Sequence, residues 1–321
     1  MRAIVVTSLG GPEVLQLADV PDPPPPGSGS VVVRIAAVGV NFAETERRRG
    51  VYSPPVLPWI PGREAAGVVM AVGAGVDPEL AGARVAYFSP GASGSYAELA
   101  TVPASTLFRF DAELSFDVMA ALPQQGLTVH GVHRLAAPAP GQTVVVLAAA
   151  GGVGQILAQL ARHGGARVLG VVSTPAKRDA IAGLGIEVIT GYDGFDEAAR
   201  ALTGGRGVDV VFDSVGRATQ AASLAALAPH GQLVCYGDAS GMPAPIDVDA
   251  LYGRSLRVGA FGLDLDRDGD ATAAARRALV TAVSRGELAI SVSRSYALAD
   301  AAAAHRELEA RRTTGKLVLV P

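Results

Sequence analysis

The run from Thr143 to Gly154 carries residue types that hold a phosphate-bearing ligand through the backbone. It reads Thr-Val-Val-Val-Leu-Ala-Ala-Ala-Gly-Gly-Val-Gly, which predicts a buried strand that passes through a turn of small residues into a helix. Small residues let the backbone approach a pyrophosphate closely, and the free amides of the helix N-terminus attract its negative charge. Against the pattern G-x-G-x-x-G, Gly151 and Gly154 fill the second and third glycine positions, and Ala149 stands at the first.

Two interpretations of this loop are open, a dinucleotide site and a tight turn without a ligand. The loop stands at the first crossover of a series of alternating strands and helices, where open sheets bind dinucleotides. This context favours the dinucleotide site. The residues predicted to line it are Ala150, Gly151, Gly152, Val153 and Gly154.

The residues after the next predicted strand indicate which dinucleotide binds. NAD selectivity requires an acidic residue there, which accepts hydrogen bonds from the ribose 2′-hydroxyl. The chain instead has Ser173-Thr174-Pro175-Ala176-Lys177-Arg178, with no acid before Asp179. Two hydroxyls and two cations suit a 2′-phosphate, so we predict NADPH. The alternative is that both cations are solvated helix residues.

The elements around this loop predict a doubly wound parallel sheet, because strand-like runs alternate with helix-length segments from about residue 121. The expected strands are 143–147, 167–172, 187–190, 208–212 and 233–236, and the expected helices are 152–163, 177–184, 195–202 and 218–227.

The flanking parts of the chain differ from this pattern. The first 120 residues have short strands at 3–7, 31–36, 67–72, 84–88 and 96–102, which indicate a β-rich barrel or sandwich. The proline-rich run 23–30 is expected to be an extended exposed loop or, alternatively, a ligand for a proline-recognition domain. After residue 263 we expect helices at 271–285 and 300–311 and a closing strand at 316–320.

Composition excludes several classes of protein. Of 321 residues, 49% are hydrophobic and 18% charged, which is typical of a compact globular chain and not of a disordered one. The net charge of −3 gives no broad positive field, so nucleic acid is not an expected partner. No apolar run approaches the roughly 20 residues that a membrane-spanning helix needs. With one cysteine and no signal peptide at the N-terminus, we expect a soluble cytoplasmic protein.

Several motifs resemble those of one family in order and spacing. They are Gly10-Gly-Pro-Glu-Val-Leu15, Gly39-Val-Asn-Phe42, Arg49-Gly-Val-Tyr52, Pro61-Gly-Arg-Glu-Ala-Ala-Gly67, Ala148-Ala-Ala-Gly-Gly-Val-Gly154 and Asp213-Ser-Val-Gly216. Together they resemble the zinc-independent quinone oxidoreductase group of the medium-chain dehydrogenase/reductase superfamily, over essentially the whole chain. This group commonly has the loop form seen at 150–154, without the first glycine.

The resemblance implies an α/β fold in which a Rossmann doubly wound parallel sheet is inserted into a β-rich GroES-like catalytic domain. Residues 1–122 and 264–321 would form the catalytic domain and 123–263 the NADPH-binding domain, with the nicotinamide in the cleft between them. It also implies a homodimer that pairs the Rossmann sheet edges. We expect the edge strand within Ser255–Phe261.

The resemblance assigns roles to particular residues. Asn41 and Tyr52 would line the nicotinamide and substrate site as catalytic residues, and Asn41 would also contact the cofactor. Tyr52 would donate a proton in enoyl reduction, or alternatively only stack on the nicotinamide or pack against the cleft wall. Lys177 and Tyr192 would contact the 2′-phosphate and Thr128 the nicotinamide amide. The remaining expected cofactor residues are Ser173, Thr174, Ser214, Tyr236 and Gly237.

We predict that no metal is bound, because ligands are missing. A structural zinc needs about four thiolates, and the chain has one cysteine, Cys235. Zinc-dependent relatives have a histidine before the glutamate where this chain has Arg63-Glu64, and no cysteine lies near Asn41. Without zinc to polarise a carbonyl, hydride transfer to an already electrophilic small molecule is the expected reaction.

Three functions are therefore open. The first is an NADPH-dependent reductase of quinones or α,β-unsaturated carbonyls, and the second is an enoyl-thioester (2-enoyl-CoA) reductase. The third is a non-catalytic NADPH-binding or sensing protein. The basic run Arg47-Arg48-Arg49 is expected to be a solvated face or, alternatively, an attractor for a phosphate-bearing substrate such as an acyl-CoA.

Overall fold

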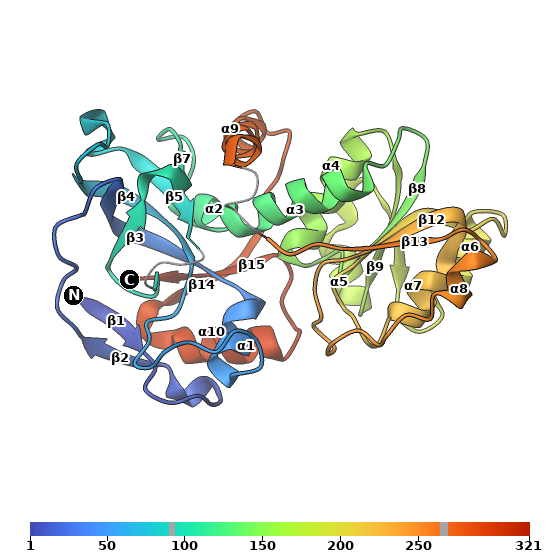
Figure 1. Ribbon diagram of the computed structural model, residues 1–321, viewed down its shortest axis with the longest axis horizontal. Helices are drawn as coiled ribbons and strands as arrows, with labels where there is room; N and C mark the ends of the chain where they lie inside the picture. The colour runs from blue at the N-terminus through green and yellow to red at the C-terminus, as the bar shows by residue number, and fades with distance from the viewer. Residues whose placement is uncertain (90–93, 264–268) are drawn as a thin grey trace. The chain divides into compact units, whose positions relative to one another are not determined.

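The structure is a computed structural model that describes residues 1–89, 94–263 and 269–321. Its contacts divide the chain into two compact units (Figure 1). Unit 1 comprises Met1–Gln124 and Asp270–Pro321, and unit 2 comprises Gln125–Gly269. The two ends of the chain thus fold together, and the middle of the chain forms a separate unit.

Unit 2 is built on a six-stranded parallel sheet, which confirms the predicted doubly wound fold. The strands are β8 (Thr143–Leu147), β9 (Arg167–Val172), β10 (Glu187–Thr190), β11 (Val208–Asp213), β12 (Leu227–Cys235) and β13 (Arg257–Ala260). Their order is β10-β9-β8-β11-β12-β13, and every pair is parallel. All five residues of β8 are buried, as expected for a strand covered on both faces. The segment 255–261 provides the edge strand, as predicted.

The helices of this part of the chain are α3 (Pro123–Ala136), α4 (Gly152–His163), α5 (Pro175–Ala180), α6 (Phe195–Leu202), α7 (Gln220–Ala226) and α8 (Asp249–Tyr252). From β8 the chain continues to β9 and β10 on one side of the sheet. It then returns past β8 to form β11, β12 and β13 on the other side. Right-handed crossovers therefore place α4 and α7 on opposite faces. The strand order reverses between β8 and β11, so their carboxyl ends form the switch point where such sheets bind ligands.

Two expected elements of unit 2 differ from the structure. The helix expected at 177–184 is two elements, α5 and a 3-10 helix at Ala182–Leu184. Helix α5 begins two residues earlier than expected, because Thr174 is its N-cap and Pro175 occupies its first position. The strand expected at 233–236 begins at Leu227, where β12 already pairs with β11 before a register shift. His230, with a left-handed φ of 65°, lies in that irregular segment.

Unit 1 is built on a seven-stranded sheet that unites the two ends of the chain. Its strands are β3 (Ser30–Val40), β4 (Glu64–Val72), β5 (Arg84–Phe88), β6 (Leu99–Pro103), β7 (Leu107–Arg109), β14 (Val292–Ala297) and β15 (Lys316–Val320). The order is β14-β15-β3-β4-β5-β7, with β6 also paired to β3. The closing strand β15 is antiparallel to β3. A separate pair joins β1 (Arg2–Val5) and β2 (Gln16–Asp19). The strand expected at 96–102 begins three residues later, at Leu99.

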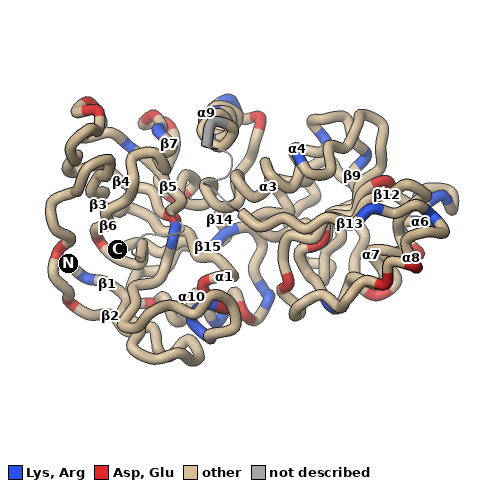
Figure 2. Tube along the Cα trace, viewed as in Figure 1, with Lys and Arg blue, Asp and Glu red and all other residues tan. Residues whose placement is uncertain are grey.

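The helices of unit 1 are α1 (Phe42–Arg49), α2 (Phe116–Ala120), α9 (Gly269–Ser284) and α10 (Ala301–Glu309). Helix α1, which lies beside α10 (Figure 1), was not expected from the sequence. Charged residues dominate its run Phe-Ala-Glu-Thr-Glu-Arg-Arg-Arg, so no apolar periodicity marks it. Its buried side chains are instead Glu44, Thr45 and Arg48. In Figure 2, basic and acidic positions are interspersed over both units.

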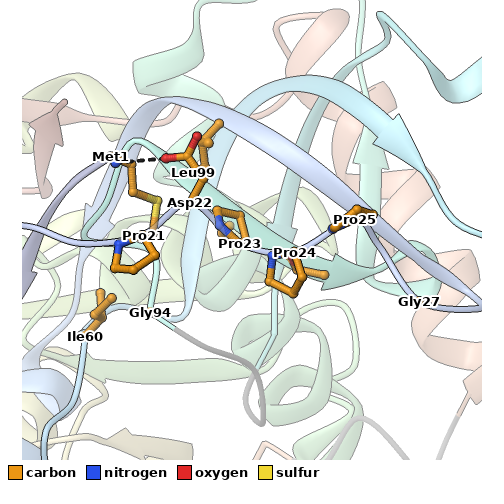
Figure 3. A pocket seen from close by; sticks show the side chains of 12 residues that line it. Met1, Pro21, Asp22, Pro23, Pro24, Pro25, Gly27, Ile60, Gly94 and Leu99 are labelled. Carbon is orange, nitrogen blue, oxygen red and sulfur yellow. Dashed lines mark hydrogen bonds and ion pairs between the residues drawn. The ribbon is translucent and has the colours of Figure 1, made fainter.

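Residues 23–29 of the proline-rich run have no regular secondary structure and are mostly exposed, as predicted for an extended loop, and Ser30 begins β3. It borders a hollow of about 420 Å³ in unit 1 (Figure 3). The ammonium group of Met1 pairs with the Asp22 carboxylate there at 2.8 Å. None of the predicted site residues lines this hollow.

Of the helices in the described part of the chain, none has the length and apolar character to cross a membrane.

Candidate active site

The loop between β8 and α4 has an open helix N-terminus. Ala148 adopts a left-handed φ of 50°, and its carbonyl oxygen accepts a hydrogen bond from the Gly151 amide at 2.8 Å. Gly151 is the N-cap of α4, and no side chain caps this helix. The first-turn amides of an uncapped helix are an anion-binding site. The N-terminus of α4 therefore has first-turn amides that could accept an anion.

The loop glycines are explained by close contacts. A Cβ atom on Gly154 would lie 2.3 Å from the Ala148 carbonyl oxygen and 2.8 Å from the Ala149 Cα. Only glycine fits there, because both neighbours are backbone. The alanine at the first glycine position is accommodated by Gly170 of β9, since a Cβ on Gly170 would lie 2.9 Å from the Ala149 methyl group. One missing glycine is thus compensated by another on the neighbouring strand.

Gln125 is a residue at this loop that sequence reasoning left without a role. It is 6% exposed, and a Cβ on Gly152 would lie 3.3 Å from its Cγ. Its side chain therefore packs against the first residue of α4. Thr128, a predicted nicotinamide contact, follows three residues later on α3 and shares that helix face.

The residues proposed for the 2′-phosphate lie at the same sheet edge as the loop, because β9 pairs directly with β8. Ser173 and Thr174 are exposed, and Lys177 is half-buried. The Thr174 hydroxyl oxygen accepts a hydrogen bond from the Lys177 amide at 3.4 Å and so caps α5. The cap fixes the position of the helix that carries the lysine.

The Asp213–Gly216 motif is held by a buried carboxylate. Asp213, 1% exposed, accepts hydrogen bonds from the Val215 amide at 2.7 Å and the Gly216 amide at 3.0 Å. The hydroxyls of Thr219 and Ser223 each donate to it at 2.8 Å. Asp213 therefore shapes the turn after β11, on the other side of the switch point from the β8 loop.

Four predicted cofactor residues come together beside this turn. Burial raises the pKa of the Tyr236 hydroxyl, which lies close to the Ser214 side chain and within electrostatic range of Tyr192. A Cβ on Gly237 would lie 2.9 Å from the Ser214 carbonyl oxygen, so Gly237 permits a close approach of two loops. Tyr192, like Ala148, packs against the hydrophobic core of unit 2.

In unit 1, Asn41 belongs to a buried polar cluster. It is the N-cap of α1, yet its side chain makes no capping hydrogen bond. Its Nδ2 donates to Glu64 Oε1 at 2.8 Å, and its Oδ1 accepts from Lys316 Nζ at 2.6 Å. Lys316 also pairs with Glu64. A capping Asn stabilises a helix by about 1 kcal/mol. Helix α1 lacks this stabilisation, because the Asn41 side chain bonds to Glu64 and Lys316 instead.

Glu64 anchors this cluster and was not predicted as a site residue. It is fully buried, and its Oε2 accepts a hydrogen bond from the Gln124 amide at the start of α3 at 2.8 Å. A Cβ on Gly39 would lie 2.4 Å from Glu64 Oε1, so Gly39 makes room for the carboxylate. Burial lowers the pKa of Lys316, and the Glu64 carboxylate opposes that effect.

Tyr52, the second predicted catalytic residue, is in a different environment. It follows α1, and its side chain is 52% exposed, whereas Asn41 is 3% exposed. The nearby charge is Arg47, which interacts electrostatically with Tyr52 and lies over the Trp59 ring at 5.0 Å. The phenol is thus accessible to a ligand and next to a cation.

The solvated-face interpretation of the basic run is wrong for Arg48. This residue is fully buried and donates to the Gly10 carbonyl at 3.0 Å and to His305 Nδ1 at 3.1 Å. It also pairs with Glu309 at 2.5 Å. Its role is to bind α1 to α10, whereas Arg49 is exposed as expected.

His305 is a neutral member of that network. Arginine only donates, so His305 Nδ1 accepts from Arg48, and Nε2 carries the hydrogen shared with the Tyr96 hydroxyl at 2.8 Å. Burial lowers the pKa of His305 to about 3, and the Arg48 charge adds to this shift. The imidazole therefore stays uncharged in the folded protein.

Metal ligands do not gather in the part of the chain that the structure describes: no group of three or more His, Cys, Asp or Glu could hold an ion there. The predicted absence of a metal stays a prediction.

Burial raises the pKa of the half-buried Cys235 thiol to about 11, with the Asp213 charge as a smaller cause. This keeps the thiol protonated and unreactive.

Comparison with known proteins identifies the family. Residues 27–112 match the alcohol dehydrogenase GroES-like domain, and residues 184–319 match the zinc-binding dehydrogenase family. The latter description includes zinc, but the single cysteine excludes a four-thiolate site.

Full-length relatives agree with these matches. A 2-haloacrylate reductase from a Burkholderia species is 37% identical, covering 100% of this chain and 99% of the relative. A quinone oxidoreductase of Pseudomonas aeruginosa is 38% identical with the same coverage. The structure of Escherichia coli quinone oxidoreductase complexed with NADPH is 35% identical, with a TM-score of 0.92 over 100% of both chains. This chain therefore belongs to the quinone oxidoreductase group of the medium-chain dehydrogenase/reductase superfamily.

Proposed function

We propose that this protein is an NADPH-dependent reductase that transfers hydride to a quinone or to an alkene conjugated with a carbonyl group. The observation that carries the proposal is the uncapped N-terminus of α4, which stands at the switch point of the parallel sheet. The names of full-length relatives, quinone oxidoreductases and a 2-haloacrylate reductase, support both acceptor classes. We further propose that 123–263 is the cofactor domain and that 1–122 and 264–321 form the catalytic domain.

The residues present fit NADPH. The amides of Gly152, Val153 and Gly154 would hold the pyrophosphate, because no side chain occupies the α4 N-terminus as a cap. Lys177, with the hydroxyls of Ser173 and Thr174, would bind the 2′-phosphate. Tyr192, Ser214, Tyr236, Gly237 and Thr128 would complete the site. When bound, the reduced nicotinamide supplies the hydride.

Asn41 and Tyr52 would act on the acceptor. The buried Asn41 amide has a fixed orientation and can orient the acceptor or the nicotinamide. The accessible Tyr52 phenol would provide the proton that alkene reduction requires at carbon. A reduced quinone takes up its protons on oxygen, and solvent can supply them directly. Tyr52 therefore matters more for alkenes than for quinones under this proposal.

A second acceptor class is favoured by a specific observation. The full-length identity to 2-haloacrylate reductase, 37%, supports reduction of alkenes that carry a carboxyl-type group, which includes 2-enoyl thioesters. Arg47 and Arg49 are near Tyr52 in sequence, and a phosphate-bearing substrate would gain from their charge. Arg48 does not contribute, because it is buried.

A substrate panel tests the function. Purified protein would be mixed with NADPH or NADH and with 1,2- and 1,4-quinones, enones, 2-haloacrylate and 2-enoyl-CoA esters, and the loss of absorbance at the nicotinamide band would be followed. We expect turnover with NADPH on quinones or activated alkenes. Tight NADPH binding with no turnover on any acceptor would support a non-catalytic binding protein, and no binding of either nucleotide would refute the proposal.

We also propose a homodimer formed through the outer edge of β13, the last strand of the sheet in the described part of the chain. Phe261 donates its amide to Cys235 of β12, so by alternation the backbone groups of Val258 and Ala260 point away from β12. Unpaired edge groups can pair with a second copy. Val258→Pro would remove one edge donor and shift a dimer to monomers in sedimentation experiments. A parent protein that is already monomeric at micromolar concentration would contradict the proposal.

A further inference from the structure

Three chain segments deliver one polar group each to the Asn41 cluster. Asn41 lies between β3 and α1, Glu64 begins β4, and Lys316 begins β15. The three are separated by 23 to 275 positions in the chain, and each is at most 4% exposed. β15 and β4 both pair with β3, so the sheet itself brings the groups together.

We propose that Lys316 is a positioning residue for Asn41: its buried ammonium, together with the Glu64 carboxylate, fixes the direction in which the Asn41 amide faces the reacting groups. The inference rests on the proposed function, in which Asn41 contacts the acceptor or the nicotinamide. It adds a residue of the closing strand, far from any cofactor motif in sequence, to the determinants of the reaction.

The chemistry of the two partners determines the amide orientation. An ammonium group only donates hydrogen bonds, and a carboxylate only accepts them. Lys316 can therefore engage only Asn41 Oδ1, and Glu64 only Asn41 Nδ2, as the distances of 2.6 and 2.8 Å show. A flipped amide would place oxygen against carboxylate and NH₂ against ammonium, so a half-turn of the amide is strongly disfavoured.

The helix cap supports this interpretation. Asn41 occupies the N-cap of α1, a position at which asparagine is favoured because its side chain can accept from the first-turn amides. Here it makes no such bond. Lys316 and Glu64 hold the side chain away from the helix it begins, which a purely local structural role does not require.

Lys316 also neutralises Glu64, so its loss has a structural effect that a test must separate from positioning. Lys316→Met retains most of the length of the side chain and removes the ammonium. We expect the kcat for the best acceptor to fall by about 10- to 100-fold, because misplacing a positioning group has effects of this size. The Michaelis constant for NADPH is expected to change less than about threefold, because the phosphate contacts belong to the other unit.

A double-mutant cycle shows whether the effect passes through Asn41. In an Asn41→Ala background, Lys316→Met should have no further effect on kcat. Independent, multiplicative effects of the two changes would overturn the proposal. Arg48→Met is the matched control, because it breaks the ion pair of the buried Arg48 with Glu309 in the same unit. It should lower the melting temperature to a similar degree as Lys316→Met but retain most of the kcat.

Two further measurements keep the outcome clear. Lys316→Met combined with Glu64→Gln removes both charges. We expect the melting temperature of this double variant to return toward the parent value while its kcat stays low. If kcat recovered as well, neutralising Glu64 would be the only role of Lys316, and the proposal would be refuted. If the parent protein turns over no acceptor, the proposed function fails by itself. The crystal structure of Lys316→Met then decides the positioning: the Asn41 side chain should rotate to cap α1, and an unchanged rotamer would refute the proposal.

Discussion

The β8 loop and the Asn41 cluster, the two regions that we propose to face ligands, are built in opposite ways. In the loop, residues 148–154 present backbone amides, and the side chains matter because they are small. In the cluster, Asn41, Glu64 and Lys316 use charged and polar side chains that are nearly inaccessible to solvent. A backbone site is sensitive to added atoms, whereas a buried side-chain site is sensitive to lost charges. The two regions should therefore fail under different changes.

The largest expected effect is on the backbone site. Gly154→Val places a branched side chain where even a Cβ would lie 2.3 Å from the Ala148 carbonyl oxygen. The loop must shift away from the helix N-terminus, so the charge-assisted contacts to pyrophosphate are lost. We expect NADPH affinity to fall by about 100-fold or more, measured by titration calorimetry or nicotinamide fluorescence.

A matched change elsewhere in unit 2 controls for glycine loss. A Cβ on Gly183 would meet no atom within 4 Å, and the residue does not have a positive φ. Gly183→Ala should therefore leave NADPH affinity and melting temperature almost unchanged. If Gly154→Val bound NADPH as tightly as Gly183→Ala does, the loop would not be the phosphate site.

This difference also explains what could be predicted from the sequence. The loop is contiguous, so its strand, turn and helix were predictable from local residue types, and β8, β9 and α4 have the expected bounds. The Asn41 cluster and the Arg48–His305 pair join residues more than 250 positions apart. Local patterns contain no signal for such pairs. The basic run Arg47-Arg48-Arg49 suggested a solvated face, but α1 buries Arg48.

The second expected effect is acid sensitivity of the side-chain network in unit 1. The pKa of His305 falls from its ordinary value of 6.5 to about 3 in the folded protein, chiefly through burial. Between these values the unfolded chain binds a proton that the folded one does not, so folding stability decreases as the pH falls. One such group changes the free energy of unfolding by up to about 1.4 kcal/mol per pH unit.

Chemical denaturation at several pH values between 7 and 4 measures this slope. His305→Gln removes the titrating group and should make the slope shallower by up to one proton, although it lowers stability at pH 7 because it disturbs the Arg48 contact. Equal slopes for His305→Gln and the parent protein would show that the imidazole is not held neutral.

A smaller effect is expected at the 2′-phosphate contact, where a side chain supplements the backbone site. Lys177→Ala should raise the Michaelis constant for NADPH by about 10- to 100-fold, since a charge-assisted contact contributes about 1.5–3 kcal/mol. The constant for NADH should change little. Arg178→Ala, at the exposed neighbouring position, measures how much the second cation contributes to the same preference. An unchanged preference for NADPH in Lys177→Ala would remove this lysine from the cofactor site.

The narrowest effect, on one class of acceptor alone, is expected at Tyr52, which belongs to neither of the two kinds of site. Its side chain is 52% exposed, so Tyr52→Phe removes only the hydroxyl and should leave stability and NADPH affinity unchanged. If the phenol donates a proton, reduction of 2-haloacrylate or enoyl-CoA should slow by about 10- to 100-fold, within the usual range for general acid catalysis. Quinone reduction should continue at nearly the parent rate, because solvent can protonate the reduced oxygen. Equal rates for Tyr52→Phe and the parent protein on every alkene would show that Tyr52 contacts the ligand without transferring a proton.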